Sequence, residues 1–119
     1  MLEEQIVTEF CQLVRIDSES GREGAIAQVL EEKLGELGFT LQRDEAGERF
    51  GGETGNIIAK LPGKGRPILL SAHLDRVQPG RGIKPVIKDG RIFSQGDTIL
   101  AADDVAGITA ILAGLRMAK

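Results

Sequence analysis

The stretch PILLSAHLDRV, residues 67–77, decides how the rest of this sequence is interpreted. Residues 67–70 are apolar without interruption, and such a run is the pattern of a central β-strand covered on both faces. We therefore expect residues 68–72 to form a buried strand. This strand is followed by His73, the single histidine of the chain, and Asp75 comes two positions later. Ligands in open α/β sheets bind at the carboxyl ends of strands, so this segment is the first candidate for a functional site.

His73 and Asp75 have the chemistry of a metal ligand and of the residue that orients it. An imidazole binds a metal through a neutral ring nitrogen, and a carboxylate that accepts the other ring N–H fixes the tautomer and the ring. The His-x-Asp pattern is weak by itself. A partly exposed histidine followed by a loop aspartate explains the same residues without any ligand, so both interpretations stay open at this point.

Three helices are expected around this stretch. Residues 2–16 carry apolar side chains at helical spacing. Ser20 and Glu23 match a capping box and predict the start of a second helix, which Gly38 ends as a left-handed stop. The third helix is expected from Asp103 or Asp104 to residue 117. The apolar face predicted for the second helix consists of Ile26, Val29, Leu30, Leu34 and Leu37.

The remaining elements are strands and turns. Residues 39–43 and 56–61 are predicted to be strands, separated by a polar, glycine-rich loop at residues 45–55. Residues 86–93 have the pattern of a hairpin, with Asp89-Gly90 as its two-residue turn. Helices and strands mixed in this order predict an α/β fold, with a mixed β-sheet flanked by helices.

Composition excludes several classes of function. The chain has 119 residues, a net charge of −3 and only four aromatic residues, all Phe, so neither a polyanion-binding patch nor a base-stacking surface is favoured.

The acidic start has no signal-peptide pattern, and no stretch reaches the roughly 18 apolar residues that span a bilayer. Cys11, the single cysteine, lies on an apolar helical face and is expected to be buried. We expect a cytoplasmic protein that binds neither nucleic acid nor membrane.

A second acidic motif lies in SQGDTILAADDVAGITAIL, residues 94–112. It places Asp103-Asp104 between small residues at a helix start. Acidic side chains at a helix N-terminus are ordinary caps, favoured by the helix dipole. Two adjacent carboxylates beside an apolar run are nevertheless costly to bury unless a cation compensates them. A carboxylate that bridges two metal ions would explain this arrangement.

The two motifs together resemble a known family. The segment HLDRVQPGRGIKPVIKDGRIFSQGDTILAADDVAGITAIL, from His73 to Leu112, closely resembles the peptidase T-like branch of the M20 zinc metallopeptidases. The stretch GNIIAKLPG and the two N-terminal helices also look like the start of the M20 catalytic domain. The resemblance covers essentially the whole chain and implies a partial zinc-peptidase catalytic domain of the phosphorylase/hydrolase-like type.

The resemblance implies a role for each acidic or imidazole side chain of the two motifs. His73 would bind one metal, Asp75 would orient His73 as part of the catalytic machinery, and Asp103 would bridge two zinc ions. The peptide bond between Asp103 and Asp104 would be cis, as is typical of the family. Val105 stands where the family commonly has lysine and Ala101 where it commonly has glycine, but neither is a ligand position.

Other parts of the family's active site have no counterpart here. Every Glu lies at position 53 or earlier and no second His exists, so the family's general-base Glu and its other ligands are missing. We therefore expect residues 1–119 to be the N-terminal segment of a catalytic domain, without the family's inserted lid or dimerisation domain. Such a segment is expected to hold zinc poorly. It should hydrolyse no short peptide alone, although the complete enzyme would.

Two alternatives remain at this stage. One is a non-catalytic binding or assembly module that keeps the motifs, and the other is a related two-zinc aminopeptidase family with similar motifs. The stretch IKPVIKDGRIFSQGDTILAADD favours the peptidase T-like branch. Residues 68–72 and the third helix are apolar on more faces than one layer covers. We therefore expect the chain to self-associate.

Overall fold

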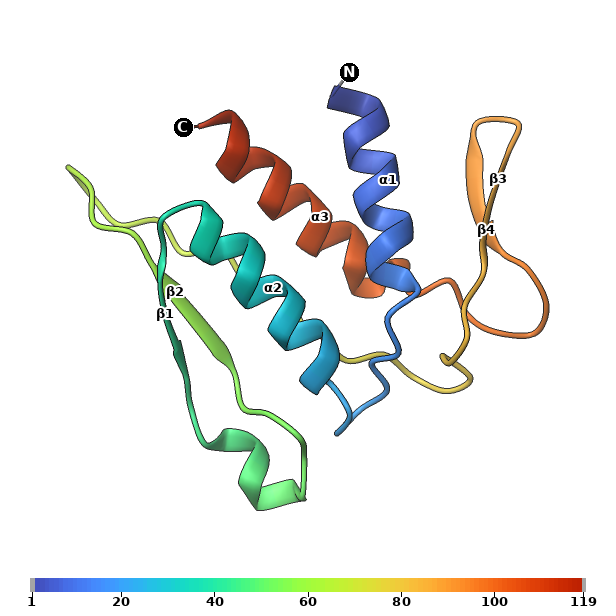
Figure 1. Cartoon of the computed structure of the whole chain (residues 1–119), viewed down its shortest axis with the longest axis horizontal. Coiled ribbons are helices and arrows are strands. Elements are labelled where there is room, and N and C mark those ends of the chain that lie inside the picture. The colour runs from blue at the N-terminus through green and yellow to red at the C-terminus, as the bar shows by residue number, and fades with distance from the viewer. Residues whose placement is uncertain (1, 119) are drawn as a thin grey trace.

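The computed structural model describes residues 2–118, which form helices and two separate antiparallel sheets (Figure 1). This combination confirms the α/β class predicted from the sequence. The elements in chain order are α1 (Leu2–Val14), α2 (Gly24–Glu36), β1 (Thr40–Arg43), the 3₁₀-helix η1 (Ala46–Phe50), β2 (Ile57–Lys60), β3 (Pro85–Lys88), β4 (Arg91–Ser94) and α3 (Ala102–Met117).

The core lies between the three long helices. α1 packs against α3, and α2 packs against β1 and β2. The β3–β4 hairpin projects on the side of the molecule away from β1 and β2 (Figure 1). Leu13, Val14 and Ile26 have no exposed surface, and Cys11 is buried as expected. Within residues 2–118 no helix has both the length and the apolar character that crossing a membrane requires.

The C-terminal end of α1 is capped by a side chain that comes from far along the sequence. Arg76 is almost fully buried, and its Nη1 donates to the carbonyl oxygen of Val14 at 2.8 Å. Its Nη2 lies 3.5 Å from the carbonyl oxygen of Leu13. The last carbonyls of a helix have no partner within the helix, so this guanidinium supplies the missing donors. It thereby ties α1 to the segment that carries His73 and Asp75.

The start of α2 differs from the prediction and its end agrees with it. Glu23 occupies the N-cap position and makes no side-chain capping bond, so the predicted capping box of Ser20 and Glu23 is wrong. The Ser20 hydroxyl is instead bonded to Asp75. At the other end Gly38 has φ 92°, and the N–H of Phe39 donates to the carbonyl of Leu34. These are the features of a Schellman motif, as the left-handed stop predicted.

β1 and β2 pair in an antiparallel register in which Thr40 lies opposite Lys60. The connection predicted as a loop contains η1. One carboxylate organises this connection, because Asp44 Oδ1 accepts the N–H of Ala46 at 3.1 Å and that of Asn56 at 2.7 Å. Gly55 packs so tightly on the main chain of Asp44 that a Cβ there would overlap the Asp44 carbonyl oxygen.

The second hairpin forms as predicted. β3 and β4 are antiparallel, with Val86 opposite Phe93. Asp89 and Gly90 both have positive φ, 54° and 73°. Two successive positive φ values are what a type I′ turn requires, and the Asp-Gly sequence is well suited to supply them.

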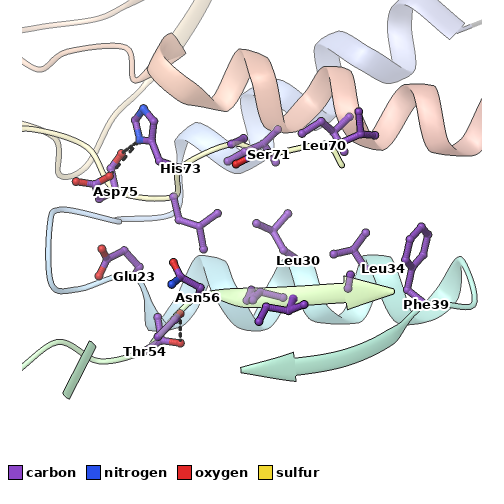
Figure 2. A pocket seen from close by; sticks show the side chains of 18 of the residues that line it. Glu23, Leu30, Leu34, Phe39, Thr54, Asn56, Leu70, Ser71, His73 and Asp75 are labelled. Atoms are coloured by element: carbon purple, nitrogen blue, oxygen red, sulfur yellow. Dashed lines mark hydrogen bonds and ion pairs between the residues drawn. The ribbon is translucent and has the colours of Figure 1, made fainter. Parts of the chain in front are cut away.

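The strand predicted at residues 68–72 is wrong in this structure. These residues join no sheet ladder, and Ile68 and Leu69 are 86% and 90% exposed. Residues 68–75, the extended segment, run between α3 and β2 (Figure 2). Arg76, which follows them, makes a single parallel bridge with Glu19. A run of apolar residues becomes a buried central strand only when neighbouring strands pair with it. Within residues 2–118 no strand does so.

The start of α3 is irregular at its two aspartates. Ala101 has φ 71°, and neither Asp103 nor Asp104 has helical backbone angles. The peptide bond that joins these two residues is cis, as expected. The regular helix therefore begins after Asp104 and runs to Met117, which agrees with the predicted range.

Candidate functional site

The two sequence motifs meet in space. His73, on the extended segment, places its Nε2 2.8 Å from Oδ1 of Asp103, at the start of α3, although 30 positions separate the two residues. The expected juxtaposition of these side chains is therefore present. Both side chains are accessible, since His73 is half exposed and Asp103 is almost fully exposed. An approaching ion can reach the two donor atoms from solvent.

Asp75 holds the other side of the imidazole. The side-chain Oδ1 of Asp75 lies 3.1 Å from Nδ1 of His73, and the main-chain carbonyl oxygen of Asp75 lies 3.0 Å from the same nitrogen (Figure 2). Both oxygens are acceptors, so Nδ1 must carry the proton. The remaining nitrogen, Nε2, then faces Asp103. This geometry is the one in which a histidine presents Nε2 to a cation.

His73, Asp75 and Asp103 form a cluster of ionisable side chains, and their contacts set its electrostatics. The hydrogen bond to Asp103 raises the pKa of His73 above its ordinary value, and the contacts with Asp75 act in the same direction, while partial burial opposes them. The hydrogen bond from Ser20 is the main cause that lowers the pKa of Asp75. With Nδ1 protonated, a second proton on Nε2 makes the 2.8 Å contact with Asp103 a charge-assisted hydrogen bond, and a metal ion can take the place of that proton.

Asp103 and Asp104 divide their tasks. Oδ1 of Asp104 accepts the N–H of Gly107 at 3.2 Å, so Asp104 caps the first turn of α3. A Cβ at position 107 would collide with that carboxylate. Asp103 makes no such bond to the helix and faces His73 instead. The alternative in which both aspartates are caps therefore holds for Asp104 and fails for Asp103.

Ser20 also belongs to this cluster, although no pattern in the sequence indicates it. The hydroxyl of Ser20 donates to Oδ2 of Asp75 at 2.7 Å, across 55 positions of sequence. The local pattern assigned Ser20 to a helix cap, and no spacing in the sequence links it with Asp75. The segment Asp17–Gly21 breaks the helical pattern between two helices, which was the one sign that these residues have a task outside a helix.

The donor set fits zinc in type but not in number. Imidazole nitrogen and carboxylate oxygen are both common zinc ligands, and protein zinc sites use three or four such side chains. Among residues 2–118 no cluster of three or more His, Cys, Asp or Glu side chains could hold a metal ion. His73 and Asp103 therefore form a pair of donors rather than a closed site.

A cavity of about 640 Å³ opens beside this cluster, between β2 and the extended segment. Figure 2 shows His73, Asp75, Glu23 and Asn56 toward one end and apolar side chains toward the other. The apolar lining includes Leu30, Leu34, Phe39, Leu70, Ile108 and Leu112. The cavity thus takes the place of the strand pairing that residues 68–72 were expected to have.

Comparison with known proteins gives relatives that are much longer than this chain. No protein-family model matches the sequence. An uncharacterized protein of Bacillus subtilis, YqjE, is 38% identical over 98% of this chain and 32% of its own length. A probable carboxypeptidase of Paracoccidioides brasiliensis is 33% identical over 90% of this chain and 27% of its own length.

Two solved structures have the same fold over nearly the whole chain. The aminopeptidase PepT from Bacillus cereus superposes with a TM-score of 0.88 at 41% identity, covering 96% of this chain and 31% of that one. A tripeptidase from Staphylococcus aureus gives a TM-score of 0.84 at 36% identity with the same coverage. This chain therefore spans about a third of the length of these peptidases, and the likeness supports a peptidase origin.

Proposed function

We propose that residues 1–119 are the N-terminal portion of the catalytic domain of an M20 two-zinc metallopeptidase of the peptidase T-like branch. The complete protein would act as an aminopeptidase on short peptides such as tripeptides. One observation carries the proposal. His73 Nε2 and Asp103 Oδ1 lie 2.8 Å apart, and Asp75 holds the opposite ring nitrogen. The likeness to an aminopeptidase and a tripeptidase supports the reaction class.

Each side chain has a defined task in this proposal. His73 would bind a zinc ion through Nε2, and Asp103 would bind through its carboxylate in a bridging position. Asp75 would keep the proton of the imidazole on Nδ1, so that Nε2 remains a ligand. Bound zinc supplies Lewis acidity that polarises the scissile carbonyl and lowers the pKa of a water. The general base and the other ligands are not among the residues described.

The scope of the chain's own activity follows from its donor set. Two donors hold zinc weakly compared with three or four, so this chain alone would bind zinc with low affinity.

The complete protein would take a short peptide as its partner. It would work in the cytoplasm, where a single unpaired cysteine such as Cys11 is stable.

Nuclear magnetic resonance of the ring nitrogens tests the metal-binding part of the proposal. His73 is the only imidazole in the chain, so its two ¹⁵N signals are assigned without ambiguity. Zinc should shift Nε2 and leave the proton on Nδ1. Asp103→Asn should lower the zinc affinity by about ten-fold or more, because loss of even an outer partner costs that much. Asp97→Asn, an exposed aspartate outside the cluster, is the matched control. Zinc that shifts neither nitrogen would refute the proposal.

A chimera tests the peptidase part. This chain replaces the matching third of the Bacillus cereus aminopeptidase, to which it is 41% identical. We expect the chimera to hydrolyse peptides, and we expect His73→Ala to abolish that activity while Asp97→Asn keeps it. A folded chimera that binds zinc and hydrolyses nothing would favour the alternative of a non-catalytic module.

A further inference from the structure

We propose that Ser20 is a positioning residue for His73 and acts through Asp75. The proposal rests on the proposed function, since it assigns to Ser20 the task of preparing His73 to bind a cation. Ser20 would act without contacting the metal or the peptide. Its hydroxyl would instead fix the Asp75 carboxylate that favours a proton on Nδ1 of His73, against the Asp103 carboxylate that faces Nε2.

The contacts around Asp75 support this role. Its Oδ2 accepts the Ser20 hydroxyl at 2.7 Å, while its Oδ1 lies 3.1 Å from Nδ1 of His73. The two partners therefore engage different oxygens of the same carboxylate. A carboxylate that is held at only one oxygen can turn about its χ2 torsion, whose energy profile is broad. The second bond removes that freedom and keeps Oδ1 directed at Nδ1.

The main chain holds Ser20 in place independently of its side chain. The N–H of Ser20 donates to the carbonyl of Arg76 at 3.3 Å, and the N–H of Arg76 donates to the carbonyl of Ser18 at 3.0 Å. Between them, Glu19 and Arg76 form the parallel bridge. The buried hydroxyl of Ser18 donates to the carbonyl of Leu74 at 2.7 Å. Residues 18–20 are thus fastened alongside residues 74–76, and this pairing delivers the hydroxyl to Asp75.

No competing task explains the Ser20 side chain. It does not cap α2, whose N-cap position is Glu23 without a side-chain bond. Among residues 2–118 its side-chain hydrogen bond is the bond to Asp75. Ser20 is also exposed, so removing its hydroxyl leaves no cavity in the core. A change at this position should therefore affect the ring of His73 much more than the stability of the fold.

The test compares Ser20→Ala, which removes the donor, with Ser20→Thr, which keeps it. The first readout is the ratio of the two neutral His73 tautomers in metal-free protein at alkaline pH, from long-range ¹H–¹⁵N spectra. The second is the affinity for zinc alone. A hydrogen bond of ordinary net strength corresponds to about a five-fold change in an equilibrium. We expect Ser20→Ala to lower both the Nδ1–H to Nε2–H ratio and the zinc affinity by about this factor.

The controls separate positioning from folding. Ser20→Thr should restore both readouts, and Ser94→Ala, which removes a remote hydroxyl bonded to Thr98, should change neither. In an Asp75→Asn background Ser20→Ala should have no further effect. An unchanged tautomer ratio in Ser20→Ala, or a full effect that persists without the Asp75 carboxylate, would overturn the proposal. The tautomer ratio needs no metal, so it decides the role of Ser20 even if zinc fails to bind and the proposed function falls.

Discussion

Replacing Glu9 with glutamine should destabilise the fold by releasing a charged contact that joins the three long helices. Glu9 lies on α1 with its side chain 9% exposed. Arg116 of α3 donates to its two oxygens at 2.7 and 2.9 Å, and Lys33 of α2 donates at 3.0 Å. The substitution keeps the size of the side chain and removes its charge, so two cations lose their anionic partner.

The size of the effect follows from the exposure of the partners. Removing one member of a fully buried ion pair costs about 3–5 kcal/mol, whereas exposed pairs contribute about 0–1 kcal/mol. The side chains of Arg116 and Lys33 are 42% and 23% exposed, so solvent partly screens both. We therefore expect Glu9→Gln to lower the free energy of unfolding by about 1–2 kcal/mol. For a chain of this length that corresponds to a fall of about 4–8 °C in Tm.

The same contact makes stability depend on pH. Burial raises the pKa of Glu9, but the hydrogen bonds and charges of Arg116 and Lys33 outweigh burial and hold that pKa below its ordinary value. A carboxyl whose pKa is lower in the folded state stabilises above its unfolded pKa. That stability is lost as the pH falls through the folded pKa. The destabilisation by Glu9→Gln should therefore be full at pH 7 and should shrink as the pH falls below about 4.3, the ordinary pKa of a glutamate.

Urea unfolding followed by circular dichroism at pH 7 and at pH 3 measures both effects. Glu32→Gln, at an exposed position within α2, is the matched control and should match the wild-type protein at both pH values. The reasoning is refuted if Glu9→Gln unfolds with the wild-type free energy at pH 7. It is equally refuted if the two glutamine variants lose the same stability.

Three further outcomes are expected from other parts of the molecule. Gly55→Ala should lower the free energy of unfolding by roughly 3 kcal/mol, because its Cβ would overlap the backbone of Asp44. Gly63→Ala, with open space around it, should leave that free energy nearly unchanged in the same unfolding assay. Sedimentation across a concentration series should show self-association, and lysine at both Ile68 and Leu69 should reduce it, while a monomer at all concentrations would contradict this expectation. The purified chain should hydrolyse no di- or tripeptide with added zinc, and metal-dependent turnover free of contaminants would show that the site is misread.

Elements whose conformation is decided locally could be predicted from the sequence. The Asp89-Gly90 turn supplies both positive φ values of its hairpin, and Gly38 supplies the left-handed residue that ends α2. Ser20 shows the limit of local patterns. Its spacing to Glu23 satisfies a capping box, yet its hydroxyl bonds Asp75, a residue 55 positions away. The Asp75 carboxylate competes with the helix N-terminus for the Ser20 hydroxyl, and the sequence does not show that Asp75 lies close to Ser20 in the folded chain.

The extended segment and the site show a second limit. An apolar run such as residues 68–72 indicates that burial is favourable, but it does not identify the strand that would pair with it. In the described structure Ile68 and Leu69 remain exposed for want of a neighbour. The approach of His73 to Asp103 was expected through the family resemblance rather than through any periodicity. Their roles as metal ligands remain predictions that follow from that resemblance.

Arg76 links the end of α1 to the segment that holds Ser20, through its guanidinium on one side and its backbone N–H on the other. Its bond to the carbonyl of Val14 breaks when the last turn of α1 frays, and the backbone N–H of the same residue donates to Ser18. Both contacts belong to one buried residue, so local unfolding of the helix end should also release the segment that precedes Ser20. In hydrogen exchange the amides of Arg76 and Ser20 should then exchange at rates that follow the last turn of α1. The first helix would in this way set how long His73 keeps its orientation, although it contributes no atom to the site.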